Sequence, residues 1–199
     1  MRDLVKVLML SIGLIEAEIT RLLSDVELWI RNKTDLAFKH LQRLLSVDPH
    51  LRADWIAAFD HEREEGCERL GGTHMLWHGL WAFKIDAQKA RTDLVTSEPI
   101  DDRSVGASGG ALVLTELKKI KNVSRSDIEH VFATAKAQAL NYVSGALGAI
   151  ELKSQVHLVA VSMHPIPNEV MPEDTFEQGK IIRYLNIVVD PPTPSKWKY

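Results

Sequence analysis

The stretch that decides the fold reads ALVLTELK over residues 111–118. Its side chains are apolar on both faces for several residues, which is typical of a strand at the buried centre of a sheet. Side chains two residues apart on a strand share a face, so Glu116 and Lys118 project together. Charged side chains at the end of an apolar strand cost free energy unless they are ion-paired or bind a metal. We therefore expect this strand both to form the centre of the sheet and to carry a functional site.

The segments around this strand predict a mixed α/β protein. Runs of β-branched, aromatic and alternating apolar residues predict strands at 76–86, 91–96, 111–118, 157–162 and 181–189. A helix is expected from Ser124 to about Leu147, and Asp127 completes a capping-box-like start. The order of these elements indicates a mixed central β-sheet flanked by helices.

The N-terminal part of the chain is expected to be helical. Residues 1–65 contain one glycine, Gly13, and their apolar residues recur at three- and four-residue spacing. One apolar stripe stops before the Asp-Pro pair at 48–49, which predicts the end of a helix there. A further helix is expected from about residue 55 to 70, ending at the glycine pair 71–72.

These patterns divide the chain into three parts. They are an N-terminal helical segment (1–65), an α/β core (66–190) and a Pro-rich tail (191–199) that we expect to be mobile. The helical segment either packs on the core or serves as an arm that binds a protein partner or forms a homodimer.

Composition excludes several classes of protein. The 199 residues are 45% hydrophobic and 26% charged, which is enough to build one sizeable core and excludes a disordered chain. A single cysteine, Cys67, excludes an intrachain disulfide scaffold and indicates a reducing compartment. The longest apolar run, at 7–15, is too short to span a bilayer, so we expect a soluble, cytoplasmic protein without membrane contact. A net charge of −3 gives no overall positive field, so any phosphate binding must depend on a local basic cluster or a bound metal.

A second carboxylate lies on the strand predicted before the central one. If these two strands pair as a hairpin through the loop at 97–110, Asp93 comes close to Glu116. Two carboxylates and a backbone carbonyl make a hard oxygen site suited to Mg²⁺ or Mn²⁺. Asp101 and Asp102 are an alternative to Asp93, but they fall in a polar, turn-like loop, so we prefer Asp93.

This arrangement resembles the Asp…(Asp/Glu)-x-Lys signature of the PD-(D/E)xK nuclease superfamily, with Asp93, Glu116 and Lys118 as its members. The resemblance covers roughly residues 66–162, and the strand expected at 181–189 would be its final strand. The stretch AKAQALNY at 135–142 resembles the Gln-containing helix that follows the catalytic strand in many of these nucleases. The superfamily's name-giving proline is replaced by a threonine here. The same Glu-x-Lys letters recur at 151–153 without an apolar strand in front, which indicates a solvated helix end.

The resemblance implies a restriction-endonuclease-like core and a metal-dependent nuclease that hydrolyses phosphodiester bonds in DNA. Asp93 and Glu116 would bind Mg²⁺ or Mn²⁺, Lys118 would position the attacking water, and Gln138 would support the site. Glu68, on the helix before the first strand, is implied as a further metal ligand. The alternative is a catalytically inactive interaction protein that keeps the nuclease-like fold, or a subunit of a larger assembly.

Two further groups of polar residues are candidates for a functional role: a basic cluster and a pair of histidines. Lys119, Lys121 and Arg125 follow the candidate metal ligands, where a phosphate backbone would need neutralising, although a solvated strand end fits them equally well. His74 and His78 are four residues apart and could hold a metal, but packing or loop roles are preferred because no His-Glu-x-x-His pattern is present.

Overall fold

The computed structural model describes residues 7–9, 11–13, 15, 26–62, 64–83, 86–87, 90–91, 94–97, 113–143 and 155–192. Its longer helices are α2 (Val26–Val47), α3 (Pro49–His61), α4 (Glu64–Trp77) and α6 (Arg125–Val143). Its main sheet consists of β1 (Trp81–Phe83), β4 (Leu94–Ser97), β5 (Val113–Ile120), β6 (Gln155–Ser162), β7 (Thr175–Glu177) and β8 (Lys180–Val188). A separate small hairpin joins β2 (Asp86–Ala87) to β3 (Ala90–Arg91). The prediction of a mixed α/β protein with a central mixed sheet is confirmed.

The strands of the main sheet lie in the order β1-β4-β5-β6-β8-β7. β4 is antiparallel to both β1 and β5, whereas β6 is parallel to both β5 and β8. A parallel connection needs a crossover, and α6 lies in the chain between β5 and β6 to supply it. In the strand order, β5 and β6 lie at the centre of the sheet. The central position that the apolar stretch at 111–118 predicts is therefore confirmed for β5.

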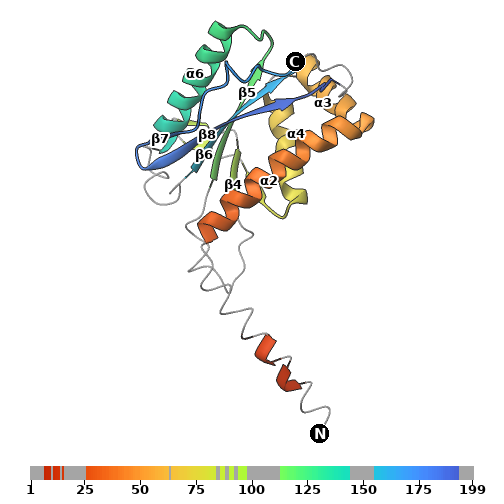
Figure 1. The fold of residues 1–199 in the computed structure, drawn as a ribbon, viewed down its shortest axis with the longest axis vertical. Coiled ribbons are helices and arrows are strands. Elements are labelled where there is room, and N and C mark those ends of the chain that lie inside the picture. Colours follow the sequence, from red (N-terminus) through yellow and green to blue (C-terminus); the bar gives the residue numbers. More distant parts are fainter. Residues whose placement is uncertain are drawn as a thin grey trace.

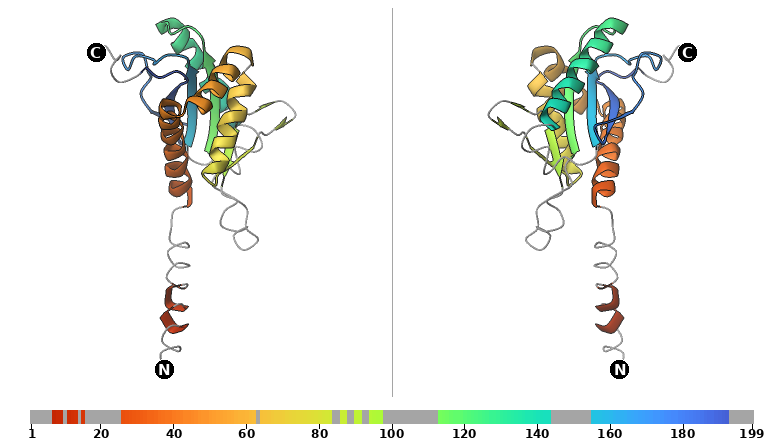
Figure 2. Two further views of the ribbon diagram at one scale, coloured as in Figure 1. Left: turned by 90° about the vertical axis from the view of Figure 1, so that its right-hand side faces the viewer. Right: turned by 90° about the vertical axis from the view of Figure 1, so that its left-hand side faces the viewer.

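Helices cover both faces of the sheet. Figure 1 shows α2, α3 and α4 on one side and α6 on the other, and the two panels of Figure 2 look onto these two faces. Along β5 the side chains alternate between the two layers. Val113 and Leu117 join the core beneath α2, α3 and α4, whereas Leu114 and Ile120 join the core beneath α6. Glu116 and Lys118 lie two and four residues after Leu114 on the strand. Their side chains therefore point to the same face as Leu114, the face that α6 covers.

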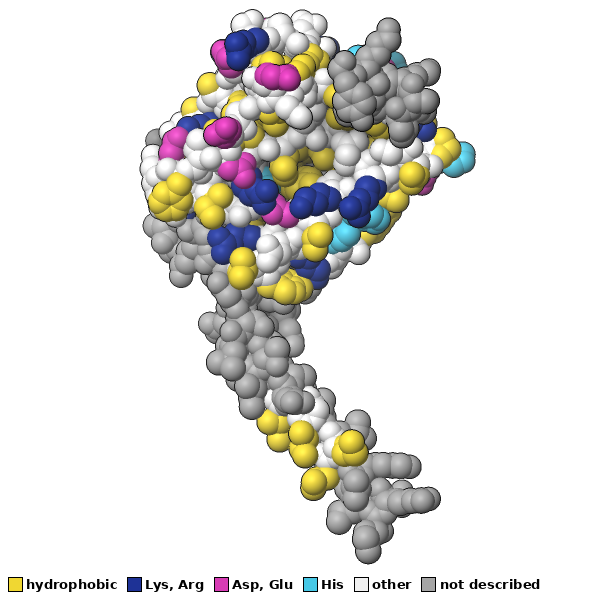
Figure 3. Space-filling model, in the orientation of Figure 1, with side chains coloured by type: hydrophobic (Ala, Val, Ile, Leu, Met, Phe, Trp, Pro, Cys, Tyr) yellow, Lys and Arg dark blue, Asp and Glu magenta, His cyan; other side chains and the backbone are white. Residues whose placement is uncertain are grey.

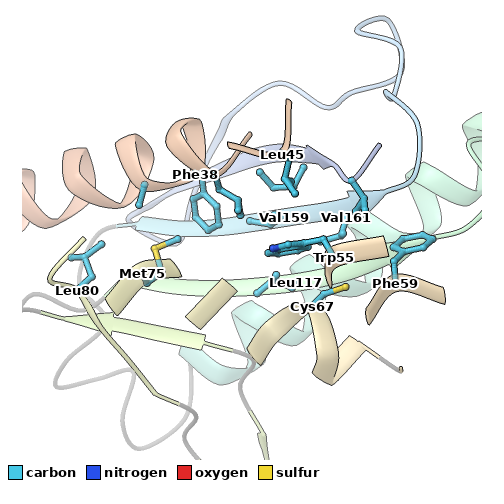
Figure 4. Close-up of a cluster of buried hydrophobic side chains, with 14 of the residues drawn as sticks. Phe38, Leu45, Trp55, Phe59, Cys67, Met75, Leu80, Leu117, Val159 and Val161 are labelled. Atoms are coloured by element: carbon cyan, nitrogen blue, oxygen red, sulfur yellow. The ribbon is translucent and has the colours of Figure 1, made fainter. Parts of the chain in front are cut away.

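The larger core holds the three N-terminal helices on the sheet. Trp55 of α3 is 1% exposed, and Figure 4 shows its ring among Leu117, Val159 and Val161 of the central strands. Phe38 of α2 lies over the same sheet face. Burial of such large apolar side chains accounts for the attachment of α2, α3 and α4, at roughly 1.5–3 kcal/mol for each buried Leu, Val or Phe.

The prediction of a single helix from about residue 55 to 70 is wrong in two respects. The segment forms two helices, because α3 ends at His61 and Glu62 has an extended backbone at its C-terminal cap. α4 then continues through Gly71 and Gly72 to Trp77, so residues 76–77 are helical rather than part of a strand. A glycine costs a helix only about 1 kcal/mol relative to alanine, and both glycines are buried where α4 packs against the protein. The packing of the helix outweighs the local signal.

Most other boundaries agree with the sequence. α2 ends at Val47, before the Asp-Pro pair, and Asp48 caps α3 by accepting hydrogen bonds from the backbone of His50 and Leu51. The predicted strands at 157–162 and 181–189 correspond to β6 and β8, while the three-residue β7 was not predicted. Residues 144–147 of the expected long helix and the tail at 193–199 lie outside the described residues. No helix in the described ranges is long and apolar enough to cross a membrane.

Candidate active site

The second half of β5 has a neighbouring strand on one side only, within the described residues. The ladder with β4 runs from Thr96–Val113 to Leu94–Thr115, whereas the ladder with β6 continues to Ile120. Glu116 and Lys118 lie in this half of β5. The first turns of α4 are near enough to it for Glu64 to contact Lys118. Residues from a strand and a helix therefore meet at this edge.

Lys118 is held between two carboxylates. Its Nζ lies 3.0 Å from Oε1 of Glu116 and 3.1 Å from Oε2 of Glu64. The side chains of Glu116 and Lys118 are 6% and 13% exposed, so this pair is largely removed from water, whereas Glu64 is 42% exposed. The two-residue period of the strand brings Glu116 and Lys118 together. Glu64 contacts Lys118 only because the tertiary structure places the start of α4 near β5.

The electrostatics of Glu116 are those of a buried carboxylate in an acidic neighbourhood. Burial raises the pKa of Glu116, Lys118 lowers it in part, and the nearby charges of Glu64 and Glu68 raise it further. Glu68 lies one turn after Glu64 on α4 and is 3% exposed. Glu64 and Glu68 thus add negative charge around Glu116, and a bound cation would relieve the repulsion among the three carboxylates.

A groove opens beside this cluster. A cavity of about 290 Å³ is lined by Glu64, Lys118, Lys119 and the α6 residues His130, Val131, Thr134 and Gln138. Gln138 is exposed on α6. It follows Ala135 by three residues, and both Ala135 and Ile128 of this helix are buried against the sheet. The structure thus brings Gln138 and Lys118 to the same groove.

A larger cavity of about 600 Å³ shares Glu64, Lys119, His130 and Val131 with the first. Its charged lining is predominantly acidic: Asp60, Glu62, Glu64 and Asp127 face only two lysines, Lys119 and Lys121. A bare phosphate backbone is therefore not favoured in this cavity without a cation.

The three basic residues singled out in the sequence have different surroundings. Lys119 donates to the backbone oxygen of Glu62 at 3.1 Å and stacks over the ring of Phe59, whereas Lys121 is exposed in the larger cavity. Arg125 forms an ion pair with Glu129, at 3.5 Å, and lines neither cavity. Figure 3 shows a further row of Lys and Arg side chains across the face where α2 lies. Lys39 and Arg43 of that helix are exposed.

Asp93 lies outside the described residues, as do Asp101, Asp102 and the second Glu-x-Lys copy at 151–153. What the structure describes is the covalent neighbour of Asp93: Leu94 pairs with Thr115, the residue before Glu116. The predicted antiparallel pairing between these two strands is therefore confirmed as far as Leu94.

Glu64 is the member of the cluster that the sequence did not single out. Its sequence neighbourhood, the charged run at 62–65, is typical of the solvated face of a helix. The available signal was its spacing from Glu68, because residues four apart on a helix share a face.

Cys67 lies between these two glutamates in the chain but is not a candidate nucleophile. It is 1% exposed, and burial raises the pKa of its thiol to about 11. The thiol therefore stays protonated at neutral pH, as expected for a structural cysteine.

The acidic cluster does not bring three ligand atoms close together. Within the described residues, the one group of three or more His, Cys, Asp or Glu ligand atoms that lie within 4.8 Å of one another consists of histidines. Mg²⁺, however, is commonly held by one or two carboxylates and keeps several waters. Glu116 and Glu68 are hard oxygen donors of the kind that it prefers.

No protein-family model, curated protein or solved structure gives a significant match to this chain.

Proposed function

We propose that this protein is a metal-dependent nuclease that hydrolyses phosphodiester bonds in DNA. The observation that carries the proposal is the ion pair between Glu116 and Lys118, which lies beside the acidic side chains of α4 at a groove. A carboxylate and a lysine two residues apart on a central strand are the Glu-x-Lys part of the signature that the sequence resembles.

The topology supports a restriction-endonuclease-like core. α4 precedes the sheet, β4 and β5 pair antiparallel, and α6 leads to β6, which is parallel to β5. The signature requires the strand that carries its first acidic residue to lie beside the Glu-x-Lys strand. Leu94, which directly follows Asp93 in the sequence, pairs with Thr115, which directly precedes Glu116, and this supports the required arrangement.

In this proposal Glu116, Asp93 and Glu68 hold Mg²⁺ or Mn²⁺. The donor set fits, because all three are carboxylates and the acidic neighbourhood of Glu116 favours a cation. When bound, the metal polarises a phosphoryl oxygen and lowers the pKa of its water.

The protein side chains supply positioning. Nζ of Lys118, held by Glu64, donates a hydrogen bond to the attacking water and directs it toward phosphorus. Gln138 reaches the groove from the opposite wall and donates its amide N–H to the substrate. Lys119 and Lys121 attract the phosphate backbone, and because the larger cavity is mainly acidic, we expect DNA binding to require the divalent cation.

A second candidate is a non-catalytic interaction protein or a subunit of a larger assembly. Two observations favour it: the acidic lining of the larger cavity, and an exposed apolar segment at the N-terminus. In that segment Val7, Leu8, Met9, Ile12 and Ile15 are each more than half exposed. Such a surface is typical of one that binds a partner chain or a second copy.

The test is cleavage of supercoiled plasmid, linear duplex and single-stranded DNA with Mg²⁺, Mn²⁺ or EDTA. We expect metal-dependent cleavage by the wild type and a loss of about 10²-fold or more in Asp93→Asn, Glu116→Gln and Lys118→Met. Two matched controls should retain activity: Glu129→Gln, which alters an exposed glutamate on α6, and Lys153→Met, which alters the second Glu-x-Lys copy.

Cleavage that survives in Lys118→Met and Glu116→Gln would refute the assignment of the site. Absence of cleavage in every form, together with no loss of Mn²⁺ affinity in Glu116→Gln, would favour the interaction protein.

A further inference from the structure

Three histidines converge at the C-terminal end of α4, which is remote from the candidate active site. His40 belongs to α2, His74 to α4, and His78 directly follows α4. One ligand nitrogen from each ring lies within 4.8 Å of the other two. Glu64 and His74 are ten residues apart on α4, which corresponds to about 15 Å along the helix, so this cluster is distinct from the acidic one.

The local structure explains why the rings meet. His74 and His78 are four residues apart, a spacing that places side chains on the same side of a helix. Their ring centroids are 4.9 Å apart, and the His40 centroid lies 5.4 Å from that of His74 and 4.9 Å from that of His78. The packing of α2 beside α4 supplies the third ring.

The hydrogen bond of His74 leaves one of its ring nitrogens available for a ligand. Nε2 of His74 donates to the backbone oxygen of Ala37 at 2.9 Å, which leaves its Nδ1 with the lone pair. That Nδ1 is buried and has no hydrogen-bond partner among the described residues. Metal-binding histidines usually donate their other ring N–H to a carbonyl or carboxylate in this way. Nδ1 of His40 and Nε2 of His78 share a hydrogen bond of 2.8 Å, so they already face each other, and a bound cation would replace this hydrogen bond.

Lowered pKa values favour the neutral form of His74 and His78, which is the form that binds metals. Burial lowers the pKa of His74 to about 4, and burial together with the charges of His40 and Lys33 lowers the pKa of His78. Binding of a cation at neutral pH would then require no proton release from His74.

We propose that His40, His74 and His78 form a binding site for Zn²⁺ that clamps α2 to α4. Three imidazole nitrogens suit Zn²⁺ and related transition-metal ions rather than Mg²⁺, which prefers oxygen. His40 is exposed and His78 is half-buried, so a fourth position is open to water or to an added ligand. The site is independent of the proposed nuclease activity.

One charge opposes a cation here. Nζ of Lys33 stacks on the ring of Trp29 at 4.0 Å, and it lowers the pKa of His78 by repulsion. Removing this ammonium group should strengthen Zn²⁺ binding. Lys33→Met therefore offers a variant in which the proposal predicts a gain rather than a loss.

The experiment is a Zn²⁺ titration of the full chain, free of any purification tag and stripped with chelator, competed against a chromophoric zinc indicator. We expect one Zn²⁺ per chain, a loss of more than about tenfold in affinity in His40→Ala, and a severalfold gain in Lys33→Met. His40 is exposed, so its replacement should not unfold the protein. His50→Ala, which removes an exposed histidine from α3, should bind Zn²⁺ like the wild type.

Thermal unfolding gives a second readout. Zn²⁺ should raise the melting temperature of the wild type, because it binds only the native state, and should not raise that of His40→Ala. The proposal is overturned if the wild type binds Zn²⁺ no better than His40→Ala. It is also overturned if Zn²⁺ affinity falls in Glu116→Gln and persists in His40→Ala, because the ion then binds at the acidic cluster.

Discussion

Asp35 on α2 accepts a hydrogen bond from Nε2 of His157 on β6, with 2.7 Å between the nitrogen and Oδ1. The histidine side chain is fully buried, and Arg183 of β8 forms an ion pair with the other oxygen of Asp35. This connection joins the first described long helix to the centre of the sheet. It also makes the stability of the fold depend on pH.

We predict that the free energy of unfolding falls as the pH drops below about 6.5, the ordinary value for histidine. Burial lowers the pKa of His157 in the folded protein, and Asp35 offsets this only in part. Below about pH 6.5 the unfolded chain therefore binds a proton at His157 more readily than the folded protein does. The free energy of unfolding consequently rises with pH in this range. Urea unfolding between pH 7.5 and 5 measures the slope.

His157→Gln should show a shallower slope than the wild type, whatever its absolute stability, whereas His50→Gln should keep the wild-type slope. Burial raises the pKa of Asp35, but His157, Arg183 and Lys39 outweigh this effect and leave it below its usual value. Asp35 therefore adds a separate loss of stability only below about pH 3.8. Equal slopes in wild type and His157→Gln would contradict this account.

Lys118→Met should destabilise the protein more than the double substitution Glu116→Gln/Lys118→Met. Lys118→Met leaves the buried carboxylate of Glu116 without its nearest cation, at a cost of about 1–3 kcal/mol. In Glu116→Gln/Lys118→Met no charge remains buried on the strand, so the two effects should not add. A double-mutant cycle from urea unfolding gives the coupling energy, and additivity within error would show that the pair does not interact.

Trp55→Ala should cost about 3–5 kcal/mol, because its ring fills the core between α3 and the central strands. Trp77 provides the matched control, since it is 66% exposed and Trp77→Ala should change stability by less than about 0.5 kcal/mol. Thermal or chemical unfolding measures both. Similar losses in the two variants would mean that Trp55 does not hold α3 on the sheet.

Asp48→Ala should destabilise the protein by about 1 kcal/mol. Its Oδ1 accepts the backbone N–H groups of His50 and Leu51 at 2.9 and 3.1 Å, and loss of such an N-terminal cap typically costs this amount. Asp54→Ala, at an exposed position within the same helix, serves as the control and should be close to neutral. Chemical unfolding at neutral pH distinguishes the two, and equal effects would exclude a capping role for Asp48.

Local patterns predict the elements around the candidate site but fail where packing decides. The apolar stretch at 111–118 predicts the central strand, and the Ser124–Asp127 start predicts α6, in which Ser124 Oγ accepts the backbone N–H of Asp127. The glycine pair at 71–72 misleads, because burial of α4 outweighs the low helix propensity of glycine.

By itself, the sequence determined that Glu116 and Lys118 share a face of a strand in a mixed α/β protein, because that follows from the two-residue period of a strand. It could not place Glu64 on Lys118, Gln138 across the groove or His40 beside His74, since each of these pairs joins separate elements. Those approaches depend on how α4, α6 and α2 pack on the sheet. Helix packing is set by the summed burial of many apolar side chains, and no local pattern of polar residues specifies it.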